Sequence, residues 1–278
     1  EEGFELSNNG RYLVGQSPFS DSKEDLLFID EQVETFTDFS TGISGDLIDF
    51  LMNLKGVSRE TAERLVKGNK EDLPDEFVLK DICKDANDFY KKSILKSNEA
   101  KKYLKNRGFT ERDIEEYEFG YADNYGNTLT KKLLKKYDRE DILKAGICKA
   151  DKEGKLVDLF WKRLIIPIRD SQGDVVAFGG RVLGDGTPKY INSPESPIFH
   201  KREMLFGWHV AHKIECNAYI LCEGYMDTIA LHKAGLKNAV ASLGTALSKM
   251  QCELLTDKKR VYVLYDTDTA GINAAKKA

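Results

Sequence analysis

Residues 218–224 read Ala-Tyr-Ile-Leu-Cys-Glu-Gly, and residues 260–266 read Arg-Val-Tyr-Val-Leu-Tyr-Asp. Each segment is a short apolar run, typical of a buried strand, that ends in an acidic residue. A third apolar run lies between them, and helix-like segments separate the three. Because strands that alternate with helices usually pair in parallel, this region predicts a parallel sheet flanked by helices. The predicted strands are 219–222, 239–241 and 261–265, and the predicted helices are 228–234, 249–255 and 270–278.

Acidic side chains directly follow two of the predicted strands. Glu223 follows the first strand, and Asp266 and Asp268 follow the third. The carboxyl ends of parallel strands meet at one edge of a sheet, where ligands collect, so we expect these carboxylates to lie together. Side chains two apart on an extended segment point the same way, and Mg²⁺ prefers carboxylate oxygens. The pattern therefore predicts a magnesium site.

The competing interpretation is that these acidic residues cap helices or lie in solvated loops, as single acidic residues after strands commonly do. Three such residues at the ends of two strands, beside glycine-containing turns, favour the metal site, because like charges gathered at one edge repel unless a cation is present. Asp227 keeps both interpretations, as a metal ligand or as a cap of the helix predicted from residue 228.

The remaining sequence differs from this alternating region. Residues 1–44 read as short strands and turns, residues 81–136 are mostly helical, and residues 163–181 read as a hairpin whose turn is 170–173. Residues 67–74 are polar and end in a proline, which is typical of a linker. The predicted fold class is a multidomain α+β and α/β protein, with a small β module and its helices, a mixed α/β core, and a partial domain built on the parallel sheet.

Composition excludes several classes of protein. Of the 278 residues 41% are hydrophobic and 32% are charged, and no apolar run reaches the roughly 20 residues that span a bilayer. The five cysteines form no Cys-x-x-Cys pair and no disulfide pattern, and no targeting signal is visible. We therefore expect a cytoplasmic protein without a membrane partner.

Charge is unevenly distributed along the chain. Residues 1–50 carry twelve acidic and two basic side chains, a balance of −10, while the totals of 46 acidic and 42 basic leave +6 for the remainder. A phosphate backbone requires a local basic surface rather than a basic whole protein. Nucleic acid is therefore expected on the body of the chain and not on its first fifty residues.

Several motifs resemble one known family. Glu-Gly-Tyr-Met-Asp at 223–227, Ala-Ser-Leu-Gly-Thr-Ala at 241–246 and Asp-x-Asp-x-Ala-Gly at 266–271 resemble the Toprim signature of bacterial DnaG-type primases. Upstream, four further motifs resemble the polymerase core of that family: Pro-Ile-x-Asp-x-x-Gly at 167–173, Ala-Phe-Gly-Gly-Arg at 177–181, Pro-Lys-Tyr-x-Asn-Ser-Pro-Glu at 188–195 and Pro-x-Phe-x-Lys at 197–201. The resemblance runs from about residue 86 to the end.

The resemblance implies a DNA primase, a DNA-directed RNA polymerase that makes short RNA primers during DNA replication. Its partners would be a single-stranded DNA template and ribonucleoside triphosphates, and its cofactor Mg²⁺ or Mn²⁺. The catalytic residues would be Glu223, Asp266 and Asp268, which would also hold the metal together with Asp227. Arg181, Lys189, Asn192 and Lys201 match positions that line the family's groove for template and nucleotide, and Arg163 and Tyr190 are further candidates beside them.

The first 66 residues resemble the family's zinc ribbon in outline, through Tyr-x-x-Gly-x-x-Pro-Phe at 12–19 and Phe-x-x-Phe-x-x-Gly-x-Ser-Gly-Asp at 36–46. The ligand positions, however, hold Ser17, Ser20, Asp38 and Thr41. Structural zinc requires thiolate or imidazole ligands. We therefore predict a degenerate module without zinc, held together by its strands and the helices that follow them.

Together these observations predict four parts: a degenerate zinc-ribbon-like module at 1–66, a linker at 67–80, the N-terminal subdomain of the primase core at 81–205, and a C-terminally truncated Toprim domain at 206–278. The family carries a further acidic motif and a helicase-binding domain downstream. We therefore expect another metal ligand beyond Ala278, and a replicative helicase that binds a region outside this chain.

Two alternative functions remain open. The same Toprim centre serves nucleases and topoisomerases, although a topoisomerase requires a catalytic tyrosine, for which this sequence offers only Tyr225. An incomplete metal site would instead leave a non-catalytic module that binds single-stranded DNA.

Overall fold

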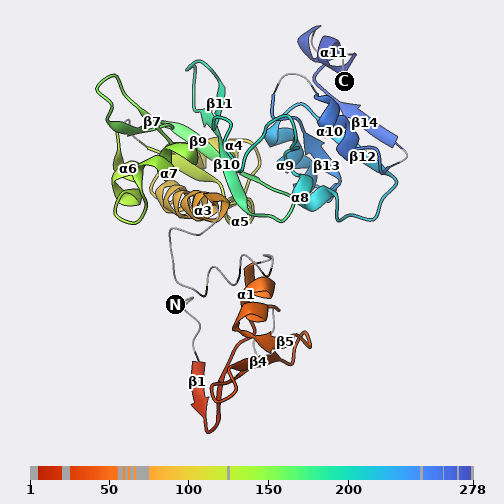
Figure 1. The fold of residues 1–278 in the computed structure, drawn as a ribbon. Helices are drawn as coiled ribbons and strands as arrows, with labels where there is room; N and C mark the ends of the chain where they lie inside the picture. Colours follow the sequence, from red (N-terminus) through yellow and green to blue (C-terminus); the bar gives the residue numbers. More distant parts are fainter. Residues whose placement is uncertain are drawn as a thin grey trace. The chain divides into compact units, whose positions relative to one another are not determined.

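The chain divides into two compact units, residues 1–74 and 75–278 (Figure 1). The structure is a computed structural model that describes residues 6–20, 26–55, 75–123, 126–244, 247–258, 260–267 and 269–276, together with residues 59, 62 and 66. Residues 67–74 of the predicted linker lie outside the described residues. Residues 75–80 form the first turns of helix α3 (Asp75–Ile94), because Leu79 and Ile82 are fully buried on its apolar face. The predicted division of the second unit at residue 205 stays a prediction.

The first unit is an antiparallel sheet of five strands followed by helix α1 (Leu47–Lys55). The helix begins at a reciprocal cap, in which the backbone N–H of Asp49 donates to the carboxylate of Asp46 and the N–H of Asp46 donates to the carboxylate of Asp49. The strands lie in sequence order: β1 (Leu6–Asn9), β2 (Tyr12–Gly15), β3 (Leu27–Asp30), β4 (Thr35–Asp38) and β5 (Ser44–Asp46).

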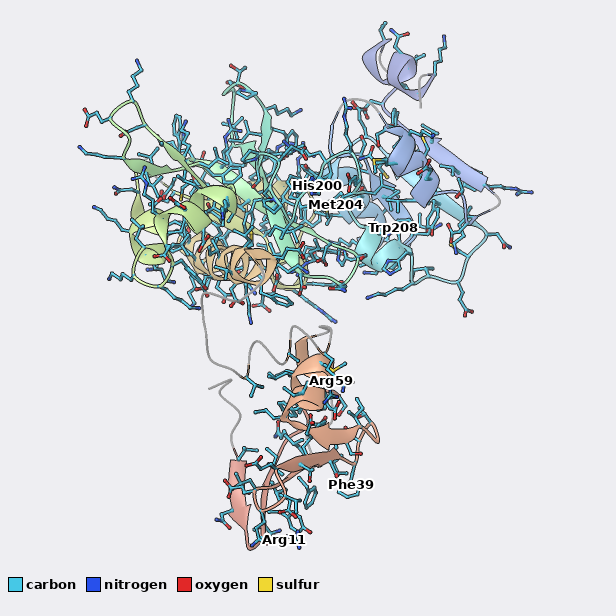
Figure 2. The ribbon with its side chains drawn as sticks, in the orientation of Figure 1. Arg11, Phe39, Arg59, His200, Met204 and Trp208 are labelled. Atoms are coloured by element: carbon cyan, nitrogen blue, oxygen red, sulfur yellow. The ribbon has the colours of Figure 1, made fainter. Side chains whose placement is uncertain are left out.

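Aromatic rings hold the helix on the sheet in this unit. Phe36 of β4 meets Phe50 of α1 edge to face, with ring centroids 4.9 Å apart, and Phe19 lies against both rings at 5.9 and 5.4 Å. Phe39 stays 65% exposed and is labelled in Figure 2. The small β module expected from the sequence is therefore present, with an aromatic core.

The second unit begins with an antiparallel sheet in the order β11-β10-β9-β6. The predicted hairpin is confirmed, since β9 (Arg163–Arg169) pairs antiparallel with β10 (Val175–Val182), and the carboxylate of Asp170 accepts three backbone N–H groups within the turn. Helix α3 packs on β6 (Gly120–Ala122) and β10. A Cβ at Gly120 would collide with Tyr90, so glycine allows this close approach.

Shorter elements complete this part of the second unit. They are α4 (Asn98–Asn106), α5 (Glu111–Glu116), α6 (Thr128–Leu133), α7 (Arg139–Lys144), β11 (Tyr190–Asn192), α8 (Trp208–Ala211) and the two-stranded ladder of β7 (Cys148–Ala150) and β8 (Leu156–Asp158). None of the helices in the described part of the chain combines the length and apolarity needed to cross a membrane.

The predicted parallel sheet is confirmed, with strand order β13-β12-β14. In the middle strand β12 (Ala218–Cys222), Cys222 is level with Ala241 of β13 (Ala239–Ala241) and with Leu264 of β14 (Arg260–Leu264). The three strands therefore end at the same edge. Helices α9 (Tyr225–Lys233), α10 (Lys249–Leu254) and α11 (Thr269–Ala275) alternate with the strands, as the sequence predicted.

One apolar core joins the two sheets of the second unit. Leu164, Ile166 and Ile168 of β9 belong to the same buried cluster as Met226 and Ile229 of α9. An ion pair at the surface also connects α9 with α5, because the ammonium of Lys233 on α9 lies 2.6 Å from the carboxylate of Asp113. The same ammonium donates to the carbonyl of Gly108. The antiparallel and parallel sheets thus form one frame.

Candidate active site

The predicted acidic residues sit at the shared edge of the parallel sheet. Glu223 follows β12 directly, and the backbone N–H of Asp266, two residues after β14, donates to its Oε2 at 3.2 Å. A Cβ at Gly271 would collide with the backbone carbonyl of Asp266, so glycine lets α11 pass close to this turn. Asp268, the third predicted ligand, lies outside the described residues.

Glu223 and Asp266 line a pocket of about 490 Å³. Asp227, in the first turn of α9, lines the same pocket, so its carboxylate stands with theirs rather than in a separate loop. Basic and polar residues at the end of α4, on β10 and in and just before β11 contribute further lining, and four of them were predicted. These four are Arg181, Lys189, Tyr190 and Asn192.

The electrostatics of the acidic side favour a cation. Burial, and then the negative charge of Asp266, raise the pKa of Asp227 above its ordinary value, whereas the nearby Arg107 partly offsets them. All candidate donors are hard oxygens, which suits Mg²⁺ or Mn²⁺. No three His, Cys, Asp or Glu side chains within the described ranges lie close enough together to form a metal site by themselves.

Arg181 is the most buried of the three basic residues that line the pocket. It is 8% exposed, and its guanidinium carbon lies 5.0 Å from the ring centroid of Tyr103 and 5.1 Å from that of Tyr190. Its Nη1 donates to the Tyr190 hydroxyl, while its Nε is buried without a hydrogen-bond partner among the described residues. Aromatic rings stabilise the charge through the faces of the guanidinium, so the remaining N–H donors at its edge stay available for an anion.

A partly buried pair of hydrogen bonds fixes the position of Asn192. The hydroxyl of Tyr225 donates to Asn192 Oδ1 at 2.8 Å, and Asn192 Nδ2 donates to the carbonyl of Leu243 at 3.1 Å. The ring of Tyr225 fits because Gly179 has no side chain, since a Cβ there would lie 2.7 Å from Tyr225 Cε2. Tyr225 is 6% exposed and its hydroxyl is bonded to Asn192, so it is poorly placed to attack DNA as a topoisomerase nucleophile, and burial raises its pKa.

Two predicted residues do not line the pocket. Arg163 is 8% exposed and donates to the carbonyls of Gly180 and Pro188 at 3.1 and 3.0 Å. Its guanidinium therefore stabilises the backbone of β10 and of the loop before β11. Burial lowers its pKa. Lys201 lies elsewhere, with its ammonium 5.8 Å from the ring centroid of Phe199. The sequence showed basic residues at both positions but not which way they point.

Two residues of the site were missed by the sequence analysis. Arg107, at the C-cap of α4, lines the pocket, and its guanidinium carbon lies 5.3 Å from the ring centroid of Tyr103. Tyr103 therefore contacts both Arg107 and Arg181. Both residues lie in the segment 81–136, for which the sequence predicted only helices, and no local motif marks them.

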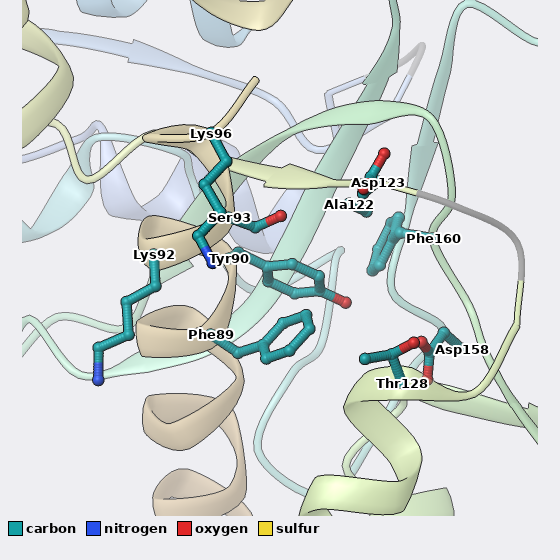
Figure 3. A pocket seen from close by; sticks show the side chains of 10 residues that line it. All are labelled: Phe89, Tyr90, Lys92, Ser93, Lys96, Ala122, Asp123, Thr128, Asp158 and Phe160. Carbon is teal, nitrogen blue, oxygen red and sulfur yellow. The ribbon is translucent and has the colours of Figure 1, made fainter.

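A separate pocket of about 300 Å³ lies beside α3 (Figure 3). The rings of Phe89 and Tyr90 project into it from the helix, and Phe160 lies across from them. The carboxylate of Asp158, which also lines this pocket, accepts hydrogen bonds from the backbone N–H groups of Leu129 and Thr130. None of the predicted site residues lines this pocket, so it is distinct from the carboxylate site.

Comparison with known proteins identifies the family. Residues 89–212 match the family model of the DNA primase catalytic core, N-terminal domain, and residues 220–278 match a Toprim-like model. The chain is 38% identical to the DNA primase of Aquifex aeolicus over 295 residues, covering 100% of this chain and 57% of that protein. It is 35% identical to the DNA primase of Halalkalibacterium halodurans, covering 98% and 49%. The chain thus spans about half the length of these relatives.

Solved structures agree with this assignment. The structure of the zinc-binding and RNA polymerase domains of Aquifex aeolicus primase covers 99% of this chain and 70% of that chain, with 34% identity and a TM-score of 0.70. A DnaG primase catalytic domain bound to single-stranded DNA covers 73% of this chain and 67% of that chain, with 37% identity and a TM-score of 0.66. In fold and in sequence, therefore, the chain belongs to the DnaG-type family of bacterial DNA primases.

Proposed function

We propose that this chain carries the nucleotidyl-transfer centre of a DNA primase, and that the whole protein makes short RNA primers on single-stranded DNA during replication. One observation carries the proposal: a single pocket is lined by the carboxylates of Glu223, Asp227 and Asp266 and by the cations of Arg107, Arg181 and Lys189. Phosphoryl transfer requires both, because metal-held oxygens and phosphate-binding cations must share one site.

The acidic residues have the role of metal ligands in this proposal. Glu223 and Asp266, with Asp268 and with Asp227 as a further candidate, hold Mg²⁺ or Mn²⁺. When bound, such an ion neutralises phosphate charge and activates the attacking hydroxyl. The N–H of Asp266 orients the carboxylate of Glu223. Burial, and then the charge of Asp266, raise the pKa of Asp227, and a bound cation would offset both effects.

The basic side of the pocket would bind the phosphates of ribonucleoside triphosphates and of the template. Arg181 offers N–H groups that its stacking tyrosines leave available, and Lys189 adds a point charge. A solved DnaG catalytic domain binds single-stranded DNA, and the polymerase domain of Mycobacterium tuberculosis DnaG binds a duplex with an overhang. These complexes support a DNA template for this chain. Membership of the primase family supports a helicase partner for regions outside the chain and a cytoplasmic location.

The test is to incubate the full-length protein with single-stranded DNA, labelled ribonucleotides and Mg²⁺ or Mn²⁺. Oligoribonucleotides that require both template and metal are the expected product. Cleaved or relaxed DNA would replace the proposal with a nuclease or topoisomerase function. DNA retained without any product would leave the non-catalytic binding module.

A further inference from the structure

Three of the four positions expected to hold zinc ligands gather around one buried carboxylate. Asp38 is fully buried, and its Oδ1 accepts the backbone N–H groups of Ser40 and Thr41 at 3.1 and 2.9 Å. The same oxygen accepts the hydroxyls of Ser40 and Thr41. The hydroxyl oxygen of Ser17 lies 3.0 Å from that of Ser40, which extends the network to a second loop.

These residues do not fit zinc. The cluster offers one carboxylate and hydroxyls but neither thiolate nor imidazole, and no three His, Cys, Asp or Glu side chains gather as a metal site in the described parts of the chain. The oxygen that faces the cluster is also occupied, because Oδ1 already accepts four donors. The similar Aquifex aeolicus structure is described as containing a zinc-binding domain, so this chain departs from that neighbour.

We propose that Asp38 replaces a structural metal ion in this chain, tying the loop at Ser17 to the turn at residues 38–42 so that the first unit folds without zinc. Backbone hydrogen bonds hold the turn at residues 38–42. The N–H of Asp38 donates to the carbonyl of Ile43, and the N–H of Gly42 donates to the carbonyl of Asp38, both at 2.8 Å. The other end is connected to the core.

The loop at Ser17 carries Phe19, whose ring packs on Phe36 of the sheet and Phe50 of the helix. Losing the network would therefore free Phe19 and loosen the contact between helix and sheet. A metal performs the same task when it joins two ligand pairs on separate loops.

The first test measures zinc content and hydrogen exchange in the full chain. We expect far less than one zinc per chain, and amide exchange in residues 12–46 that is unchanged after treatment with a strong chelator. Stoichiometric zinc, or exchange that accelerates when the metal is removed, would overturn the proposal.

The second test removes parts of the network. Asp38→Asn should speed exchange of the Ser40 and Thr41 amides by about 10- to 100-fold, because a neutral amide oxygen accepts the four hydrogen bonds more weakly than a carboxylate. In one orientation its NH₂ would also be buried where Oδ2 has no partner among the described residues. Thr41→Val, which removes one hydroxyl, should give a smaller increase. Glu31→Gln, at an exposed turn of the same sheet, is the control. Equal exchange in Asp38→Asn and the control would refute the role of Asp38, even if Thr41→Val proves neutral.

The third test reverses the replacement. A full chain with Ser17→Cys, Ser20→Cys, Asp38→Cys and Thr41→Cys should bind one zinc ion, detected by elemental analysis and by cobalt absorption. Zinc should also restore slow exchange to residues 12–46. If the variant binds no zinc even when refolded with the metal, then these positions do not form a zinc-like junction and the proposal fails.

Discussion

Asp38 and Asp227 have the same type of side chain, but the protein shifts their pKa values in opposite directions. Burial works against the charged form of Asp38, but hydrogen bonds from Ser17, Ser40 and Thr41 outweigh burial and lower its pKa. Burial and the charge of Asp266 raise the pKa of Asp227. The first carboxylate has its partners within the protein, whereas the charge of the second is offset only in part, by Arg107 and by backbone N–H groups. Carboxylates that are satisfied stabilise the fold, and carboxylates that are not satisfied are available to a ligand.

The largest effect should come from Asp266→Asn in the full-length protein. If Asp266 binds metal as proposed, its loss should reduce primer synthesis by about 100-fold or more, with DNA binding and thermal stability nearly unchanged. Primer assays at saturating template measure the loss, and Glu253→Gln, an exposed carboxylate on α10, serves as the control. Full synthesis by Asp266→Asn would remove the basis for treating the strand-end carboxylates as functional.

Gly179→Ala should lower stability through the bridge that holds Asn192. The new Cβ would lie 2.7 Å from Tyr225 Cε2, and overpacking of a buried ring costs about 1–3 kcal/mol. Thermal unfolding of the full chain measures the change. Gly244→Ala, where a Cβ meets nothing within 4 Å, is the matched control. Equal melting temperatures for the two variants would show that Tyr225 is not held as tightly as described.

Tyr103→Leu should weaken phosphate binding by about 3- to 30-fold, because stacking of Arg181 and Arg107 on an aromatic ring contributes about 0.5–2 kcal/mol. Calorimetric titration with inorganic tripolyphosphate measures this effect without catalysis. Tyr103→Phe should retain the affinity, since the Tyr103 hydroxyl has no hydrogen-bond partner among the described residues. Equal losses in both variants would assign the role to the hydroxyl instead of the ring.

The smallest effect concerns stability against pH. Because the pKa of Asp227 is raised in the folded state, its contribution to stability is greatest below the unfolded value of about 3.9 and is lost as pH rises through the folded pKa. Asp227→Asn should therefore raise the melting temperature at neutral pH by about 1–3 °C, a modest shift because the site is partly solvated. The tryptophans, Trp161 and Trp208, both lie in the second unit and report its unfolding.

The contribution of Asp38 to stability depends on pH in the opposite direction. Its lowered pKa gives stability that is fully present above about pH 3.9 and is lost as pH falls through the folded pKa. A lower melting temperature for Asp227→Asn at neutral pH, measured without metal, would contradict the comparison between the two aspartates.

The parallel sheet and the carboxylates at its edge were predictable because local pattern determines them. Apolar runs such as residues 219–222 alternate with helices, and strand ends fall where the apolar residues stop. The position of Asp38 was also identified, but its network was not, because Ser40 was not among the expected ligand positions.

The basic side of the pocket was harder to predict. Tyr103 and Arg181 are far apart in sequence, and no local periodicity records that they stack. Arg163 was predicted as a groove residue because sequence shows charge but not direction, whereas its guanidinium donates to backbone carbonyls in the structure. Long-range packing and side-chain direction were therefore the missing information.

The ion pair of Lys233 has a consequence for how firmly two sides of the pocket are held together. Lys233 fastens the end of α9 to the carbonyl of Gly108, the residue after Arg107, while the first turn of the same helix carries Asp227. This contact therefore helps to set the distance between Arg107 on one side of the pocket and Asp227 on the other. Raised salt, which screens this ion pair, should therefore loosen the contact between α9 and the residues that follow α4.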